Sequence, residues 1–304
     1  MISIPAVVCA TDLSEGSNKA IPLAAYIAKS LKSKLVVTHI IDLPAVTPYG
    51  ETMVDPQELK IRVEQATRTQ LTDILAHIDG VDWELHISIG YPAKEIQNVV
   101  NEVSAGLLVA ATHVRSGLER LLLGSVSRKL INTLTVPFLI VPGSLPADRS
   151  SLHRTESIMI ACDFSEDAVK AIEWGTAFAR TFSAKLTLAT VIEQGQLNQI
   201  LTMDPQRELA VADRLIEDLT ARLKAYIPDD LKDSATTMVF AGHPHEELNK
   251  YAILNHIDMI VMGVHGRGFI ENLMVGSTTD RLVRLGQFPV LAVCGAGRAD
   301  AQKS

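Results

Sequence analysis

The chain has 304 residues, with 28 Lys or Arg against 35 Asp or Glu, so its net charge is −7 at pH 7. This acidity is the opposite of the basic patch expected of a nucleic-acid-binding protein, and no apolar run reaches the roughly 18 residues of a membrane span. The N-terminus lacks a signal-peptide pattern, and three scattered cysteines exclude a disulfide framework. The composition therefore predicts a cytoplasmic protein that binds neither nucleic acid nor membrane.

The chain repeats itself at an offset of 151 to 152 residues. Asp12-Leu13-Ser14-Glu15 recurs as Asp163-Phe164-Ser165-Glu166, and Gly124-Ser125 recurs as Gly276-Ser277. The period is too long for a solenoid unit of about 20–50 residues. We therefore expect an N-terminal domain over residues 1–143, a linker over 144–156 and a C-terminal domain over 157–296.

Each half opens with a short apolar run, residues 7–10 and 158–161, typical of a buried strand. Ser14 and Ser165 follow as expected helix N-caps. The remaining predicted strands of the N-terminal half cover 35–40, 107–110 and 138–141, with one more ending at Gly90. Those of the C-terminal half cover 186–192, 259–262 and 290–293, with one more ending at Gly242. The predicted helices cover about 56–77 and 205–226, and others follow Pro92, Ser125, Pro244 and Ser277.

Strands that alternate with helices imply crossover connections and parallel pairing. The strands are apolar throughout rather than alternating, as expected when helices cover both faces of a sheet. The sequence therefore predicts an α/β fold with two tandem doubly wound domains, each a five-stranded, mainly parallel sheet flanked by helices. In such sheets ligands bind beyond the carboxyl ends of the strands.

A glycine-rich segment follows the fourth predicted strand of the C-terminal half. It reads Met262-Gly263-Val264-His265-Gly266-Arg267, and nine residues after Gly266 comes Gly276-Ser277. Glycines let a backbone approach a ligand and adopt positive φ, and a helix start offers unpaired amides to an anion. The spacing predicts an anion site, in which the Ser277 hydroxyl bonds either the helix or a phosphate. The alternative is a structural turn with a helix cap.

This segment, together with Asp163-Phe164-Ser165 and Pro289-Val290-Leu291, resembles the universal stress protein family in its ATP-binding class. Both halves share the resemblance, which implies the adenine nucleotide alpha hydrolase-like fold. It also implies ATP as ligand, with AMP or ADP possible in the same base pocket. Mg²⁺ is expected with ATP, since it bridges phosphates to one or two carboxylates.

The resemblance implies a role for each residue of the motif. Asp163 would contact the ribose or adenine side, or a metal, beside Ala161 and Cys162 in the base pocket, and Val191 would pack on the adenine. The residues expected around the phosphates are Met262, Gly263, His265, Gly266 and Arg267 in the turn, and Gly276, Ser277, Thr278 and Thr279 at the helix start.

The N-terminal half departs from the motif. Ala111 and Val114 replace the two glycines, while Asp12, His113, Arg115 and Gly124-Ser125 remain. A β-branched side chain tolerates positive φ poorly and would intrude where a phosphate should lie. We therefore expect the N-terminal half to bind ATP weakly or not at all.

Other kinds of site have weaker signals. His243 and His245 beside two glutamates are a weak metal candidate, although a solvated helix start is favoured. No Walker motif or dinucleotide fingerprint occurs. Nothing in the sequence places a base at a γ-phosphate, so no catalytic residue is predicted.

The function expected from these patterns is ATP binding coupled to stress response or signalling, with little or no catalysis. The alternatives are a non-nucleotide scaffold or ligand or metal carrier, and a slow ATPase. The family commonly dimerises through its last strands, which implies an internal pseudo-dimer with residues 138–141 against residues 290–293. That pairing would cover two sheet edges, and two chains would associate as a homodimer. The sequence does not name a protein partner.

Overall fold

The computed structural model describes residues 2, 4–42, 56–112, 124–145, 154–193, 195, 205–266 and 276–294. In the N-terminal half the strands and helices alternate in chain order, as the apolar patterning predicts. Its elements are β1 (Ala6–Ala10), α1 (Glu15–Asn18), α2 (Ala20–Leu31), β2 (Lys34–Ile41), α3 (Pro56–Leu75), β3 (Trp83–Ile89), α4 (Pro92–Glu102), β4 (Leu107–Ala111), α5 (Ser125–Thr133) and β5 (Phe138–Val141).

The C-terminal half repeats this order, with a short 3-10 helix, η1, inserted before the strand equivalent to β3. None of the helices in the described ranges is long and apolar enough to cross a bilayer. The elements are β6 (Ser157–Ala161), α7 (Glu166–Phe182), β7 (Lys185–Glu193), α9 (Pro205–Ala225), η1 (Asp229–Ser234), β8 (Ala235–Gly242), α10 (Pro244–Leu254), β9 (Met259–Gly263), α11 (Ser277–Leu285) and β10 (Val290–Val293).

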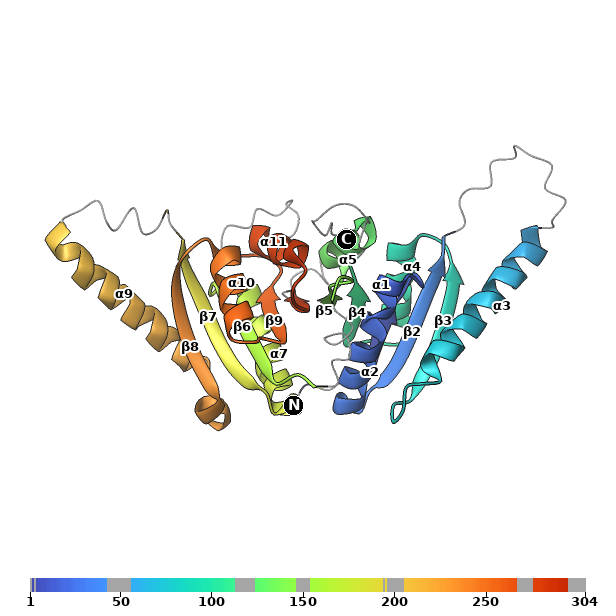
Figure 1. Ribbon diagram of the computed structural model, residues 1–304, viewed down its shortest axis with the longest axis horizontal. Helices are drawn as coiled ribbons and strands as arrows, with labels where there is room; N and C mark the ends of the chain where they lie inside the picture. Colours follow the sequence, from blue (N-terminus) through green and yellow to red (C-terminus); the bar gives the residue numbers. More distant parts are fainter. Residues whose placement is uncertain are drawn as a thin grey trace, which may run out of the picture.

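The described strands form one ten-stranded sheet in the order β3-β2-β1-β4-β5-β10-β9-β6-β7-β8. Within each half the pairing is parallel, for example between β1 and its neighbours β2 and β4. One apolar cluster joins the sheet to α2, α3, α7 and α9, and a second joins its opposite face to α4, α5, α10 and α11. Helices therefore cover both faces, which confirms the doubly wound α/β prediction (Figure 1).

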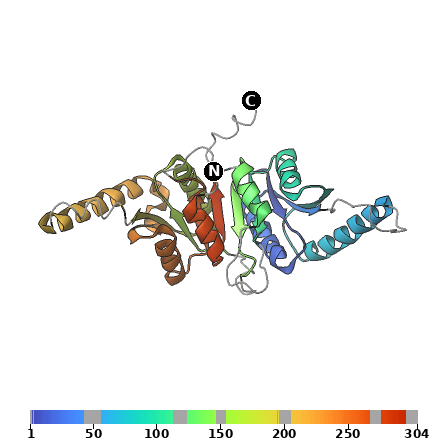
Figure 2. The ribbon, with the colours of Figure 1, turned by 90° about the horizontal axis from the view of Figure 1, so that it is seen from above.

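The halves meet where their last strands pair. β5 and β10 run antiparallel, with Leu139 opposite Leu291, and both side chains are fully buried. The pairing confirms the expected internal pseudo-dimer and removes two unpaired sheet edges. The long helices α3 and α9 consequently lie at opposite ends of the molecule, beside the edge strands β3 and β8 (Figures 1 and 2).

The first helix differs between the halves. Both predicted N-caps are confirmed, since Ser14 Oγ accepts from Ser17 N and Ser165 Oγ accepts from Ala168 N. In the C-terminal half α7 is continuous, whereas in the N-terminal half α1 and α2 are separate at Lys19. Pro22 explains the break, because proline has no N–H for the carbonyl four residues earlier and its ring clashes with that carbonyl.

A second contact between the halves lies under the sheet. The rings of Tyr26 on α2 and Phe182 on α7 stack with centroids 5.2 Å apart. The Tyr26 hydroxyl also accepts a hydrogen bond of 3.3 Å from the main-chain N–H of Thr155, a residue that is only 2% exposed. The segment entering β6 is thereby tied to a helix of the other half.

Tyr26→Phe is expected to lower the free energy of unfolding by about 1 kcal/mol, because it leaves the buried Thr155 amide without this acceptor while keeping the ring stack. Tyr91→Phe is the matched control, since the Tyr91 side chain is 79% exposed and should change stability by less than about 0.5 kcal/mol. Urea unfolding of both variants measures the difference. Equal stability of the two variants would show that the Thr155 bond contributes nothing.

Candidate functional site

The candidate site lies at the carboxyl ends of two neighbouring strands. β6 and β9 pair in parallel with Ala161 opposite Met262, so the turns that follow them emerge side by side. This pairing brings together two segments predicted to share a site although about a hundred residues separate them, Ala161-Cys162-Asp163 and the turn from Met262 to Gly266. The start of α11 joins them because the Gly276 N–H donates to the Val264 carbonyl at 2.8 Å.

The turn after β6 is closed by Asp163 and Ser165. Asp163 Oδ1 accepts from the main-chain N–H of Ser165 at 3.0 Å and from its hydroxyl at 2.6 Å. The Ser165 hydroxyl oxygen also lies 3.2 Å from the carbonyl oxygen of His265. Phe164 between them has φ +63°. The β6–α7 turn is therefore tied directly to the turn that follows β9.

The glycines of the motif are required by close packing. A Cβ on Gly263 would lie 2.7 Å from the Cβ of Asp167, and a Cβ on Gly266 would lie 2.8 Å from Oδ2 of Asp163. A Cβ on Gly276 would lie 2.9 Å from the Val264 carbonyl oxygen. None of these three glycines has positive φ, so the expectation of left-handed backbone in this turn was wrong. Steric crowding, and not the backbone angle φ, is therefore what excludes side chains at these three positions.

A buried contact between a carboxylate and a histidine, which sequence reasoning missed, supports the turn. Asp167 Oδ2 lies 2.9 Å from Nδ1 of His265 and accepts from the His265 main-chain N–H at 3.1 Å. The side chains of His265 and Asp167 are only 10% and 11% exposed. An acid in the first turn of a helix is ordinarily explained by the helix dipole. The sequence feature that could have indicated the role of Asp167 is that the N-terminal half has Gly16 at the equivalent position.

The start of α11 has open backbone donors. Its N-cap is Gly276, which has no side chain to cap the helix, and Ser277 is the first helical residue. Ser277 is exposed and Thr278 is half-buried. Thr279 is buried, and its hydroxyl donates to the Gly263 carbonyl at 3.1 Å. Of the predicted phosphate ligands at this helix, Thr279 therefore uses its hydroxyl proton to hold the turn.

The predicted base side is formed by the ends of β6 and β7. The Cys162 N–H donates to the Ala189 carbonyl at 2.8 Å, and the Cys162 side chain is buried. Val191, near the end of β7, is half-buried, as is Ala161. Arg267 lies outside the described residues, and so do His113, Val114 and Arg115 of the N-terminal half.

The metal candidate at His243 and His245 gains no support. The two rings are 6.3 Å apart, and His245 Nδ1 lies 3.5 Å from a guanidinium nitrogen of Arg281. Burial, then the charge of Arg281, lowers the pKa of His245. A cation beside His245 would meet this positive charge, and the described part of the chain holds no group of three or more His, Cys, Asp or Glu side chains suited to a metal.

The N-terminal half retains one part of the site. Asp12 Oδ1 accepts from Ser14 N at 3.0 Å, and Leu13 between them has φ +68°, so the turn after β1 matches the turn after β6. At the end of β4, Ala111 stands in the place of Gly263. The two halves therefore share the aspartate turn and differ in sequence at the end of the fourth strand.

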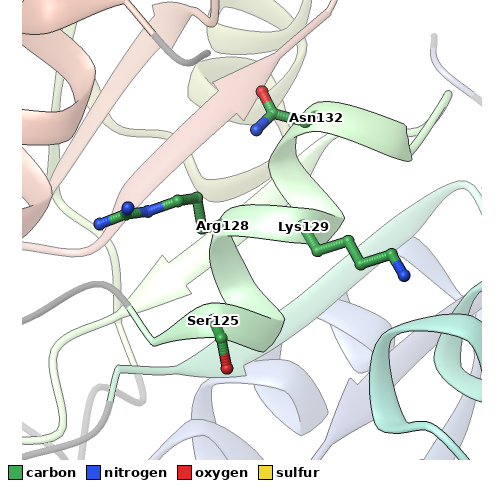
Figure 3. Close-up of a pocket in the computed structure, with 4 residues that line it drawn as sticks. All are labelled: Ser125, Arg128, Lys129 and Asn132. Atoms are coloured by element: carbon green, nitrogen blue, oxygen red, sulfur yellow. The ribbon is translucent and has the colours of Figure 1, made fainter.

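A pocket of about 410 Å³ lies on α5 and is lined by Ser125, Arg128, Lys129 and Asn132. Figure 3 shows that the Arg128 and Lys129 side chains extend to opposite sides of the helix. Two cationic groups that diverge do not enclose a common anion. The pocket is therefore a groove on the surface of α5, and its residues do not rebuild the C-terminal site.

Comparison with known proteins agrees with this architecture. The model of the universal stress protein family matches residues 4–142 and again residues 155–293. A universal stress protein of Mycolicibacterium smegmatis is 25% identical over 290 residues, covering 93% of this chain and 94% of its own length. The structure of a universal stress protein from Archaeoglobus fulgidus is 21% identical, covers 98% of this chain and all of its own, and gives a TM-score of 0.69.

A further solved universal stress protein, in complex with cAMP, covers 47% of this chain and all of its own length, with 23% identity and a TM-score of 0.35. The fold and the turn after β9 define the molecule as a tandem pair of doubly wound α/β domains with a glycine-lined site in its second domain. By the two matches to the family model, the chain belongs to the universal stress protein family.

Proposed function

We propose that this chain is an ATP-binding universal stress protein whose C-terminal half binds the nucleotide and has little or no catalytic activity. The observation that carries the proposal is the turn from Gly263 to Gly266. Hydrogen bonds with Ser165 and Asp167 fix its His265, and the Gly276 N–H joins the turn to the uncapped start of α11. Backbone donors at a helix start, combined with glycines at close approach, favour an anionic ligand.

In this proposal the adenine packs near Val191, Ala161 and Cys162, which lie at the ends of β6 and β7. The phosphates lie at the other side of the site. The residues proposed there are Met262, Gly263, His265, Gly266, Arg267, Gly276, Ser277, Thr278 and Thr279.

Asp163 is the carboxylate that fits Mg²⁺. Its Oδ1 is held by Ser165, and its Oδ2 lies against Gly266, beside the proposed phosphate turn. Mg²⁺ is usually bound by one or two carboxylates together with phosphate oxygens of the substrate. Bound there, the ion would neutralise phosphate charge, while Asp163 would orient the nucleotide.

The same proposal gives the two halves different roles. We assign the domains to residues 1–143 and 157–296, with 144–156 as linker, and expect ATP only in the second. The protein would act in the cytoplasm, where ATP occupancy alters a surface that faces another protein or a second copy of this chain.

Equilibrium titration of the full chain with ATP, ADP and AMP tests the proposal. We expect saturable ATP binding with one nucleotide per chain, and phosphate release no faster than in buffer. Two nucleotides per chain would overturn the assignment to one half. The absence of saturable adenine nucleotide binding would reject the proposal itself.

Asp163→Ala is expected to weaken ATP binding by about 10- to 100-fold, since a hydrogen bond to a charged group contributes about 1.5–3 kcal/mol. Asp12→Ala is the matched control, because Asp12 makes the same turn contact in the N-terminal half. It should leave ATP affinity unchanged. Calorimetric titration, with unfolding midpoints to confirm folding, measures both variants, and equal losses in the two would place the nucleotide elsewhere.

A further inference from the structure

Asp167 is the most buried acidic side chain at the candidate site, and its carboxylate contacts His265 twice. The His265 main-chain N–H and ring Nδ1 converge on the single oxygen Oδ2, at 3.1 Å and 2.9 Å. The two residues are 98 positions apart in the chain. One oxygen therefore fixes both the backbone and the ring of His265, the second residue after β9.

The chemistry of this contact decides where the ring carries its proton. An ionised carboxylate has no proton to donate, so Nδ1 of His265 is the donor. A proton held on Nδ1 leaves a lone pair on Nε2 of the neutral ring, so Nε2 donates to a phosphate only when the ring takes up a second proton. Asp167 thereby sets both the orientation and the tautomer of His265.

Gly263 and Asp167 form a size-matched pair. A Cβ on Gly263 would lie 2.7 Å from the Asp167 Cβ and 2.9 Å from the Ala168 amide nitrogen, so Asp167 fits only beside a glycine. In the N-terminal half the corresponding residues are Gly16 and Ala111, and a Cβ on Gly16 would meet Gly143 atoms at 3.6 Å. Only the C-terminal half therefore has the carboxylate and its close fit against a glycine.

We infer that Asp167 is a positioning residue of the nucleotide site, and that the Gly263–Asp167 pair distinguishes the half that binds ATP from the half that does not. The inference rests on the proposed function. Asp167 acts through His265, holding its ring and main chain in the geometry that receives the phosphates, in the way that outer residues orient the ligands of a metal.

If Asp167 acted only through its charge, its removal would have the opposite effect on ATP binding from the loss of a positioning residue. Removing a negative charge near a polyphosphate should strengthen binding. Loss of positioning should weaken it, by about tenfold, as for other residues that orient a ligand group from outside. The sign of the change therefore separates a positioning role from a simple charge effect.

The experiment is ATP titration of the full chain carrying Asp167→Ala, Asp167→Asn or Glu166→Ala. Glu166 is exposed and lies in the same helical turn, so Glu166→Ala removes an equal charge without touching His265. We expect a loss of about tenfold for Asp167→Ala, a smaller loss for Asp167→Asn, whose amide oxygen can still accept, and no loss for Glu166→Ala. Unchanged or tighter binding by a folded Asp167→Ala variant would overturn the inference.

A second measurement does not depend on ATP. In ¹⁵N NMR spectra of the ligand-free protein, the His265 ring should be protonated at Nδ1, and Asp167→Ala should abolish this preference. An identical tautomer in the variant would overturn the positioning role. If the wild-type chain binds no ATP, the proposed function fails, and the NMR result still decides whether Asp167 controls His265.

Discussion

Gly266→Val is expected to lower the affinity for ATP at least about a hundredfold, a change of about 2.8 kcal/mol in binding free energy. A Cβ at this position would lie 2.8 Å from Oδ2 of Asp163, closer than real Cβ contacts, and valine adds two further methyl groups. The side chain must therefore displace Asp163 or occupy the space beside the turn. Both outcomes remove contacts proposed for the nucleotide.

Calorimetric titration with ATP measures this effect, and circular dichroism confirms that the variant is folded. Gly16→Ala is the control, because a Cβ there would meet Gly143 atoms at 3.6 Å, an ordinary van der Waals distance. That variant should bind ATP as the wild type does. If Gly266→Val retained full affinity, the phosphates would lie outside this turn.

Most of the fold could be predicted from the sequence, because its signals are local. The uniformly apolar runs at 7–10 and 158–161 coincide with buried strands, and both serine caps make the expected bonds. The break between α1 and α2 also has a local cause in Pro22, which was visible in the sequence but was not used. The repeat extended these local predictions from one half to the other.

The site was only partly predictable, because its contacts join distant segments. The motif located the turn around Gly263 and Gly266, yet their reason for being glycine is the proximity of Asp167 and Asp163, about a hundred residues earlier. Asp167 had no motif of its own. The sequence indicated it only through a paired exchange, in which Gly263 and Asp167 of one half correspond to Ala111 and Gly16 of the other. This exchange can be interpreted only when β9 is known to lie against α7.

The paired exchange leads to an expected gain of function. With the C-terminal site inactivated by Gly266→Val, the N-terminal half carrying Gly16→Asp, Ala111→Gly and Val114→Gly should bind one ATP per chain. The three changes restore the carboxylate and both glycines of the motif. The remaining parts, the Asp12 turn and Gly124-Ser125 at the start of α5, are already present.

The partial variants make this test specific, and all are titrated in the Gly266→Val background. Val114→Gly alone should not bind ATP tightly, because no carboxylate then holds the turn. Gly16→Asp alone should leave the fold intact, because a Cβ at this position would meet Gly143 atoms at 3.6 Å, an ordinary van der Waals distance. It should not bind ATP tightly, because Ala111 and Val114 remain in place of the two glycines. If Val114→Gly alone restored full affinity, bulk at position 114 would be the whole difference between the halves. If the triple variant folded but bound no ATP, the paired exchange would not define the binding half, because every element argued to be missing would be present.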